Sequence, residues 1–193
     1  MKIALAGNPN SGKTTMYNAL AGKHEHVGNW AGVTVERREG RLKSSYKKAE
    51  YKDDIIVVDL PGAYSMSPFT SEESITSSYV RDEHPDVIIN IVDSTNMSRS
   101  LFFTTQLLEL GIPVVVALNK IDVNAKKQNM IDENKLSEKL KCPVIKTASL
   151  YGDGLSKLID VAVSICGKTQ PVPFTQYIGN LTDKRQVEEA ERT

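Results

Sequence analysis

The sequence predicts an α/β domain with a mostly parallel sheet of six to seven strands, one antiparallel edge strand, and helices on both faces. Strand-like apolar runs alternate with helix-like stretches, which is the order that builds a parallel sheet. The runs are near-continuous in Val, Ile and Leu, as expected for strands that helices cover on both sides. The length of 193 residues is enough for one well-buried domain with little left over.

Composition narrows the class of protein. The formal net charge is zero, which argues against a free-standing nucleic-acid binder. The two cysteines, Cys142 and Cys166, form no C-x-x-C pair and fit core positions in a reducing compartment. The N-terminus lacks the apolar region of a signal peptide, and no apolar run approaches the roughly 20 residues that span a bilayer. We therefore expect a soluble domain in the cytoplasm.

The first predicted strand, Lys2–Ala6, leads into a phosphate-binding loop and a helix over Gly12–Ala21. The loop Gly7–Thr14 fits the pattern G-x-x-x-x-G-K-[ST] in the strand–helix context that this motif requires. Its backbone N–H groups and the helix N-terminus favour phosphate. Lys13 is expected to bridge the β and γ phosphates, and the Thr14 hydroxyl to ligate magnesium. The expected nucleotide contacts of this segment are Gly7, Asn8, Pro9, Asn10, Ser11, Gly12, Lys13, Thr14 and Thr15.

The next predicted element is the antiparallel edge strand, Thr34–Ser44, in a hairpin with Ala49–Asp59. Gly32, Val33 and Thr34 precede or open this strand. A threonine here can give its hydroxyl to magnesium and its N–H to the γ phosphate, in a loop that a bound nucleoside triphosphate orders and hydrolysis releases. The alternative is that Thr34 is only a β-branched residue entering a strand.

The buried strand Ile55–Asp59 ends in Asp59-Leu60-Pro61-Gly62. Behind a phosphate-binding loop, an aspartate at this place holds magnesium through water, and the Gly62 N–H can meet the γ phosphate. The alternative is an ordinary turn built from Asp, Pro and Gly. A helix over Ser71–Asp82 is expected to follow.

Strands at Asp86–Asp93 and Pro113–Asn119 flank a predicted helix at Ser98–Leu110. The second strand ends in Asn119-Lys120-Ile121-Asp122. The Asp122 carboxylate can accept both N–H donors of a guanine edge, a match that adenine cannot make. Asn119 is expected to serve the purine and brace the loop, and the stem of Lys120 to pack on the base.

After a predicted helix at Asp132–Leu140 and a strand at Pro143–Thr147 come Thr147, Ala148 and Ser149, where a backbone N–H can contact the guanine oxygen. A last helix covers Gly154–Cys166, and prolines follow it. The predicted organisation is one domain over residues 1–170 and a linker with a short helix over 171–193. That helix, Asp183–Arg192, is either the start of a further helical domain or a frayed tail.

The four motifs together resemble those of the translation-factor-like P-loop GTPases. The stretch from Val27 to Glu36, VGNWAGVTVE, closely resembles the first switch of the ferrous iron transport protein B family. Gly7–Thr14, Asp59–Ser65 and Asn119–Asp122 match that family too, so the resemblance covers about residues 1–170.

The resemblance implies a GTPase with magnesium held by Thr14, Thr34 and Asp59. It also implies potassium as activator, held by Asn10 and by carbonyl groups around Gly28 and Trp30, so that Lys13, Thr34 and Asn10 carry catalysis. Ras-like enzymes have a water-orienting glutamine where this chain has Ala63, and we therefore expect slow hydrolysis. The family usually has proline at the position of Ala31, so the first switch should be more mobile here.

For partners, the resemblance implies GTP and GDP and a transmembrane iron-permeation domain, which in the family belongs to the same polypeptide. The domain would then lie on the cytoplasmic side of the cell membrane and regulate ferrous iron transport. No nucleic acid is expected, and the oligomeric state is left open. Two alternatives are a ribosome-associated GTPase and a nucleotide sensor with very slow turnover.

Overall fold

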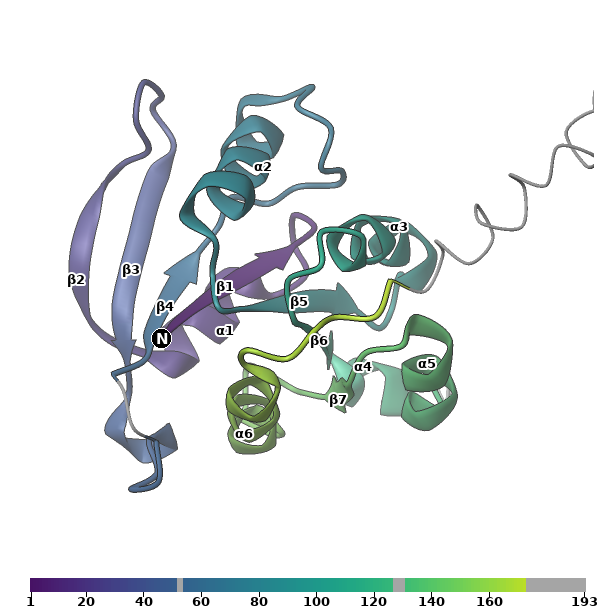
Figure 1. Cartoon of the computed structure of the whole chain (residues 1–193). Coiled ribbons are helices and arrows are strands. Elements are labelled where there is room, and N and C mark those ends of the chain that lie inside the picture. The colour runs from purple at the N-terminus through teal and green to yellow at the C-terminus, as the bar shows by residue number, and fades with distance from the viewer. Residues whose placement is uncertain (52–53, 127–130, 173–193) are drawn as a thin grey trace, which may run out of the picture.

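The computed structural model describes residues 1–51, 54–126 and 131–172, which form one sheet with helices on both faces (Figure 1). The sheet has seven strands in the order β2-β3-β4-β1-β5-β6-β7. Their bounds are β1 Lys2–Gly7, β2 Ala21–Asn29, β3 Glu36–Leu42, β4 Ile56–Asp59, β5 Val87–Asp93, β6 Val114–Asn119 and β7 Val144–Lys146. The predicted α/β fold class is confirmed.

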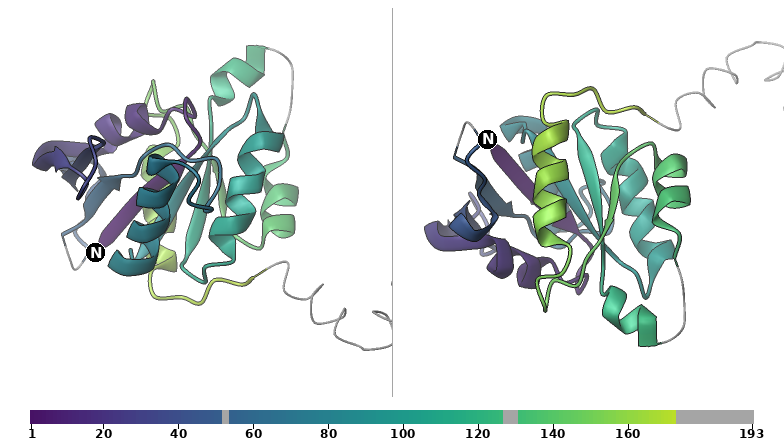
Figure 2. Two further views of the ribbon diagram at one scale, coloured as in Figure 1. Left: turned by 90° about the horizontal axis from the view of Figure 1, so that it is seen from above. Right: turned by 90° about the horizontal axis from the view of Figure 1, so that it is seen from below.

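The helices divide between the two faces of the sheet (Figure 2). Helices α1 and α6 pack on one face, and α2, α3 and α5 on the other. Their bounds, with the short α4 and the 3-10 turn η1, are α1 Lys13–Leu20, η1 Ser44–Tyr46, α2 Ser71–Glu83, α3 Met97–Leu108, α4 Ile121–Lys126, α5 Glu133–Leu140 and α6 Leu155–Ile165. The predicted helix Asp183–Arg192 lies outside the described residues.

The continuous apolar runs follow from this layering. In β1, Ile3 and Leu5 belong to the core under α1 and α6, whereas Ala4 belongs to the core under α2 and α3. Successive side chains of a strand point to opposite faces, so a strand covered on both sides must be apolar throughout. Cys142 is buried in the second core and Cys166 packs against the first, which confirms that both fill core positions.

One strand was not predicted from the sequence. Strand β3 pairs antiparallel with β4, as expected, with Arg38 opposite Asp59. It is not the edge of the sheet, however, because β2 pairs antiparallel with its other side. The sequence of β2, AGKHEHVGN, has no apolar alternation, and its pairing with β3 shifts register twice. Such a polar, irregular strand is typical of an exposed sheet edge and leaves little signal in the sequence.

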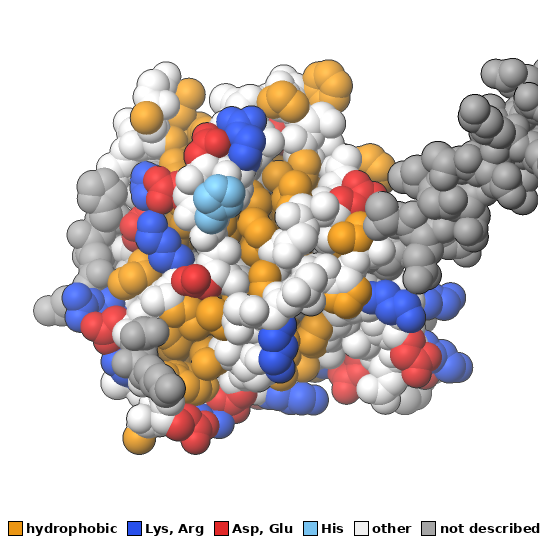
Figure 3. Space-filling model, viewed as in Figure 1, with side chains coloured by type: hydrophobic (Ala, Val, Ile, Leu, Met, Phe, Trp, Pro, Cys, Tyr) orange, Lys and Arg blue, Asp and Glu red, His pale blue; other side chains and the backbone are white. Residues whose placement is uncertain are grey.

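Charged side chains of both signs are interspersed over the face shown in Figure 3. Among the described residues, no helix is long and apolar enough to cross a membrane.

Candidate nucleotide-binding site

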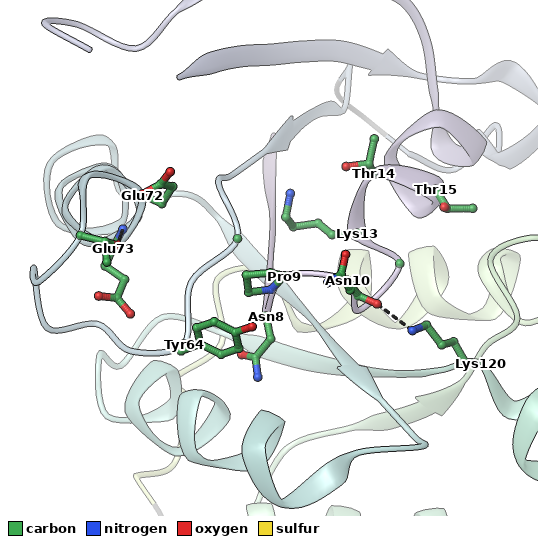
Figure 4. A pocket seen from close by; sticks show the side chains of 13 residues that line it. Asn8, Pro9, Asn10, Lys13, Thr14, Thr15, Tyr64, Glu72, Glu73 and Lys120 are labelled. Carbon is green, nitrogen blue, oxygen red and sulfur yellow. Dashed lines mark hydrogen bonds between the residues drawn. The ribbon is translucent and has the colours of Figure 1, made fainter. Parts of the chain in front are cut away.

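A cavity of about 700 Å³ opens where the parallel strands end. The phosphate-binding loop after β1 forms its floor, and the segment from Gly62 into α2 forms a wall (Figure 4). A second cavity of about 240 Å³ shares Gly12, Thr15 and Lys120 with the first. Together they form one site at the carboxyl edge of the sheet, where α/β sheets bind ligands.

The phosphate-binding loop depends on two left-handed residues, Asn10 with φ 65° and Gly12 with φ 93°. Gly12 also caps the N-terminus of α1, and a Cβ there would lie 2.4 Å from Nδ2 of Asn119. Glycine is therefore required at this position by both the backbone conformation and the space. The result is a loop that turns sharply into a helix N-terminus, the geometry that favours phosphate.

Lys13, which lines the cavity, pairs with Asp59. The Lys13 ammonium lies 2.6 Å from Oδ1 of Asp59, and the two side chains are only 10% and 8% exposed. Thr14 lines the same cavity. A hydroxyl and a carboxylate, both hard oxygen donors, fit magnesium, and the ammonium beside them fits a phosphate. The structure thus brings Lys13 and Asp59 together and places Thr14 at the cavity beside them, and their roles toward phosphate and magnesium stay predictions.

Asn119 joins the phosphate loop to the base pocket. Its amide nitrogen donates to the carbonyl of Ser11 at 3.0 Å. Its carbonyl oxygen accepts from the backbone N–H of Ser149 at 3.0 Å, from the Ser149 hydroxyl at 2.8 Å and from the Thr147 hydroxyl at 3.2 Å. The predicted bracing role of Asn119 is confirmed, and the side chain links the phosphate loop, β6 and the segment after β7.

Lys120 makes a second link. Its ammonium donates to the carbonyl of Asn10 at 2.7 Å (Figure 4) and pairs with Asp93 at 2.6 Å. Burial raises the pKa of Asp93, but hydrogen bonds from Lys120 and Thr95 outweigh burial and hold the pKa below its usual value. Asp93 therefore stays ionised at neutral pH and fixes the lysine, which lines both cavities.

Asp122 lines the second cavity with Thr15, Asn119 and Ser149, which is where a guanine edge was expected. The expected backbone donor is not found among the three residues proposed for it. The N–H groups of Thr147, Ala148 and Ser149 already donate to Leu118, Asp153 and Asn119, respectively. Ser149 lines the cavity together with Leu150, the next residue along the chain. The reason is that the turn after β7 uses its own amides to hold its shape.

The first switch does not reach the cavity in this structure. Gly32, Val33 and Thr34 lie in a small loop closed by a hydrogen bond from Trp30 N–H to the Val35 carbonyl at 2.8 Å, and Thr34 is exposed. The Trp30 carbonyl accepts from the N–H of Val33. Of the three residues expected to hold potassium, only Asn10 lines the cavity as described, so the geometry here does not form a potassium site.

The structure adds residues that the sequence did not single out. Tyr64, Thr70, Glu72 and Glu73 line the cavity from the segment that follows Gly62. Ala63 is buried. Their position in the sequence could have indicated them, because they lie between the Asp-x-x-Gly motif and the first turn of the next helix.

A phosphate loop, an aspartate at a strand end and an Asn-Lys-x-Asp pocket on this sheet define a P-loop GTPase domain. Comparison with known proteins then gives the family. The chain belongs to the ferrous iron transport protein B family, whose model matches residues 1–162.

Relatives support this placement. The Fe(2+) transporter FeoB of Salmonella typhimurium is 46% identical over 162 residues, which cover 82% of this chain and 20% of that protein. A GDP-bound point mutant of the S. thermophilus FeoB G-domain is 44% identical with a TM-score of 0.78, covering 89% of this chain and 62% of that one. The cytosolic domain of T. maritima FeoB in GMPPNP form is 38% identical with a TM-score of 0.79, covering 87% and 64%. The chain thus spans about a fifth of the length of the curated relatives it matches.

Proposed function

We propose that this domain binds magnesium–GTP, hydrolyses it slowly, and acts as the regulatory GTPase module of a ferrous iron transporter. The observation that carries the proposal is Asn119, which joins a phosphate loop and a pocket lined by the Asp122 carboxylate into one site. The S. thermophilus relative binds GDP and the T. maritima relative was solved in GMPPNP form, which supports guanine nucleotide as the ligand.

Nucleotide binding would separate the Lys13–Asp59 pair. The γ phosphate offers the Lys13 ammonium a stronger partner, and Asp59 is then freed to accept hydrogen bonds from metal-bound water. Thr14 and, after movement of the first switch, Thr34 would supply hydroxyl ligands. Magnesium, when bound, neutralises charge on the β and γ phosphates.

Hydrolysis would be slow because the usual water-orienting position holds no polar side chain. Ala63 has only a methyl group there, and it is 1% exposed. Lys13 and the loop amides would still stabilise charge on the phosphates, and Thr34 would contribute once the switch closes. We assign Asn10 to potassium, with the carbonyl groups of Gly28 and Trp30 joining only after the first switch rearranges. Potassium stimulation therefore depends on that rearrangement.

The relatives are about five times longer than the matched segment, as the 20% coverage shows, and they are transporters of Fe(2+). We propose that a membrane part of this kind is the partner, with the domain on the cytoplasmic side and the switches reporting the nucleotide state to it. Iron itself would pass through the membrane part as cargo.

The test measures GTP hydrolysis in potassium and in sodium at equal ionic strength, for the wild type and for Asn10→Ala. The proposal expects stimulation by potassium that Asn10→Ala loses. Equal rates in both salts would remove potassium from the proposal and leave GTP binding intact.

Base selectivity has a separate test. Asp122→Ala should lose the preference for GTP over xanthosine and adenosine triphosphates, because the carboxylate that matches the guanine edge is gone. Asp153→Ala is the matched control, since this exposed carboxylate lies near the pocket but does not line it. Unchanged selectivity in Asp122→Ala would refute the base-binding assignment.

A further inference from the structure

Trp30 holds the first switch against helix α2. The indole is 7% exposed and meets the ring of Tyr79, on α2, edge to face with 5.5 Å between ring centroids. The guanidinium of Arg37, on β3, lies over the same indole at 4.7 Å from its centroid. Both contacts are of kinds that stabilise a buried aromatic side chain. The first switch and the helix that follows the Asp-x-x-Gly motif are therefore joined through one side chain.

A cavity of about 480 Å³ lies beside this join, between the first switch and α2. Trp30, Val33 and Arg37 line the cavity from one side, and Ile75 and Tyr79 line it from the other. In Figure 1 the β2–β3 hairpin stands beside α2. Releasing the switch would break the contacts of Trp30 with Tyr79 and Arg37 and withdraw this segment from the second core.

The contact also carries a cost that favours release. Neither Nε1 of Trp30 nor the hydroxyl of Tyr79 has a hydrogen-bond partner among the described residues, although both atoms are buried. A buried donor without a partner destabilises the arrangement that buries it. Moving the indole out would return both groups to water.

Thr34 is coupled to this contact by the backbone. The hydrogen bond from Trp30 N–H to the Val35 carbonyl closes the loop that carries Thr34, so the loop and the indole are connected. Thr34 can reach a γ phosphate only if that loop leaves its present position.

We propose that Trp30, Tyr79 and Arg37 form a latch that holds the first switch away from the nucleotide, and that the γ phosphate of GTP releases it. The latch rests on the proposed GTP binding. Only GTP has a γ phosphate that can bind the released switch. The strength of the latch therefore sets the preference for GTP over GDP. The latch residues would then tune nucleotide discrimination from outside the nucleotide cavity.

Trp30 is the only tryptophan in the chain, so its fluorescence reports the latch directly. With magnesium and GMPPNP the emission should shift to the red and become more accessible to acrylamide, whereas GDP should leave both unchanged. The same emission and quenching in the two nucleotides would overturn the latch. Failure to bind either nucleotide, measured by calorimetry, would instead refute the proposed function.

Two substitutions of Tyr79 give opposite expectations. Tyr79→Leu removes the aromatic edge and should raise the GTP-to-GDP affinity ratio by about two- to twelvefold, the range expected for an aromatic pair. Tyr79→Phe keeps the ring and removes the unpartnered hydroxyl, so it should tighten the latch and lower the ratio. A change in the same direction for both folded variants, or in neither, would contradict the proposal.

A nucleotide-free measurement separates the latch from GTP binding. Without nucleotide, acrylamide should quench Trp30 more strongly in Tyr79→Leu than in the wild type, and no more strongly in Tyr79→Phe. Circular dichroism establishes that each variant is folded. Equal quenching in folded Tyr79→Leu and wild type would show that Tyr79 does not hold the indole.

Discussion

Replacing Asn119 by alanine should destabilise the whole nucleotide-binding edge of the sheet. The side chain is 2% exposed and makes four hydrogen bonds. The two hydroxyl partners can turn to other acceptors, but the Ser11 carbonyl and the Ser149 N–H would stay buried without this partner. Each such group costs about 1–3 kcal/mol, so the free energy of unfolding should fall by roughly 2–6 kcal/mol. That is a large share of the roughly 5–15 kcal/mol that stabilises a typical domain.

Urea unfolding followed by circular dichroism measures this loss. Asn124→Ala is the matched control, because Asn124 is also a buried asparagine but donates one hydrogen bond, to the Ser94 carbonyl at 2.8 Å. The control should lose about half as much, roughly 1–3 kcal/mol, with the same dependence on urea. If the two variants lose equal stability, Asn119 does not act as the link that the geometry indicates.

Three further predictions concern other parts of the chain. Gly154→Ala should destabilise the folded domain by about 2–5 kcal/mol, because Gly154 has φ 75° and a Cβ there would lie 2.2 Å from the Lys146 carbonyl oxygen. Thermal unfolding measures this loss. The control, Gly167→Ala, should lose less stability, because φ is 72° there but nothing lies within 4 Å. Burial raises the pKa of Cys142 to about 12, so iodoacetamide at about pH 8 should leave this thiol unlabelled until urea unfolds the protein. The pKa of Asp93 is held below its usual value of 3.8 in the folded state, so Asp93→Asn should lower the free energy of unfolding at neutral pH. The difference from wild type should vanish as the pH falls through that lowered pKa. A difference in stability that persists in acid would show that the charge of Asp93 is not responsible.

The sequence predicted the parts of the fold that depend on local pattern. Buried strands such as Val114–Asn119 are apolar throughout because helices cover both of their faces, and the phosphate loop needs glycine where φ is positive. Strand β2 escaped prediction because backbone pairing at an edge needs no apolar side chains. The position of the first switch escaped because it depends on Trp30 meeting Tyr79, a contact between segments far apart in the chain.

The four hydrogen bonds of Asn119 and the two of Lys120 have a consequence for how this domain can change over time or by engineering. The motifs are separate in the sequence but are joined by hydrogen bonds in the structure. The base pocket and the phosphate loop share the side chains of Asn119 and Lys120. The base preference therefore cannot be changed independently of the phosphate loop. Redesigning the pocket for another base would weaken phosphate binding unless the loop around Asn10 and Ser11 were redesigned with it. We therefore expect the two motifs to vary together or not at all.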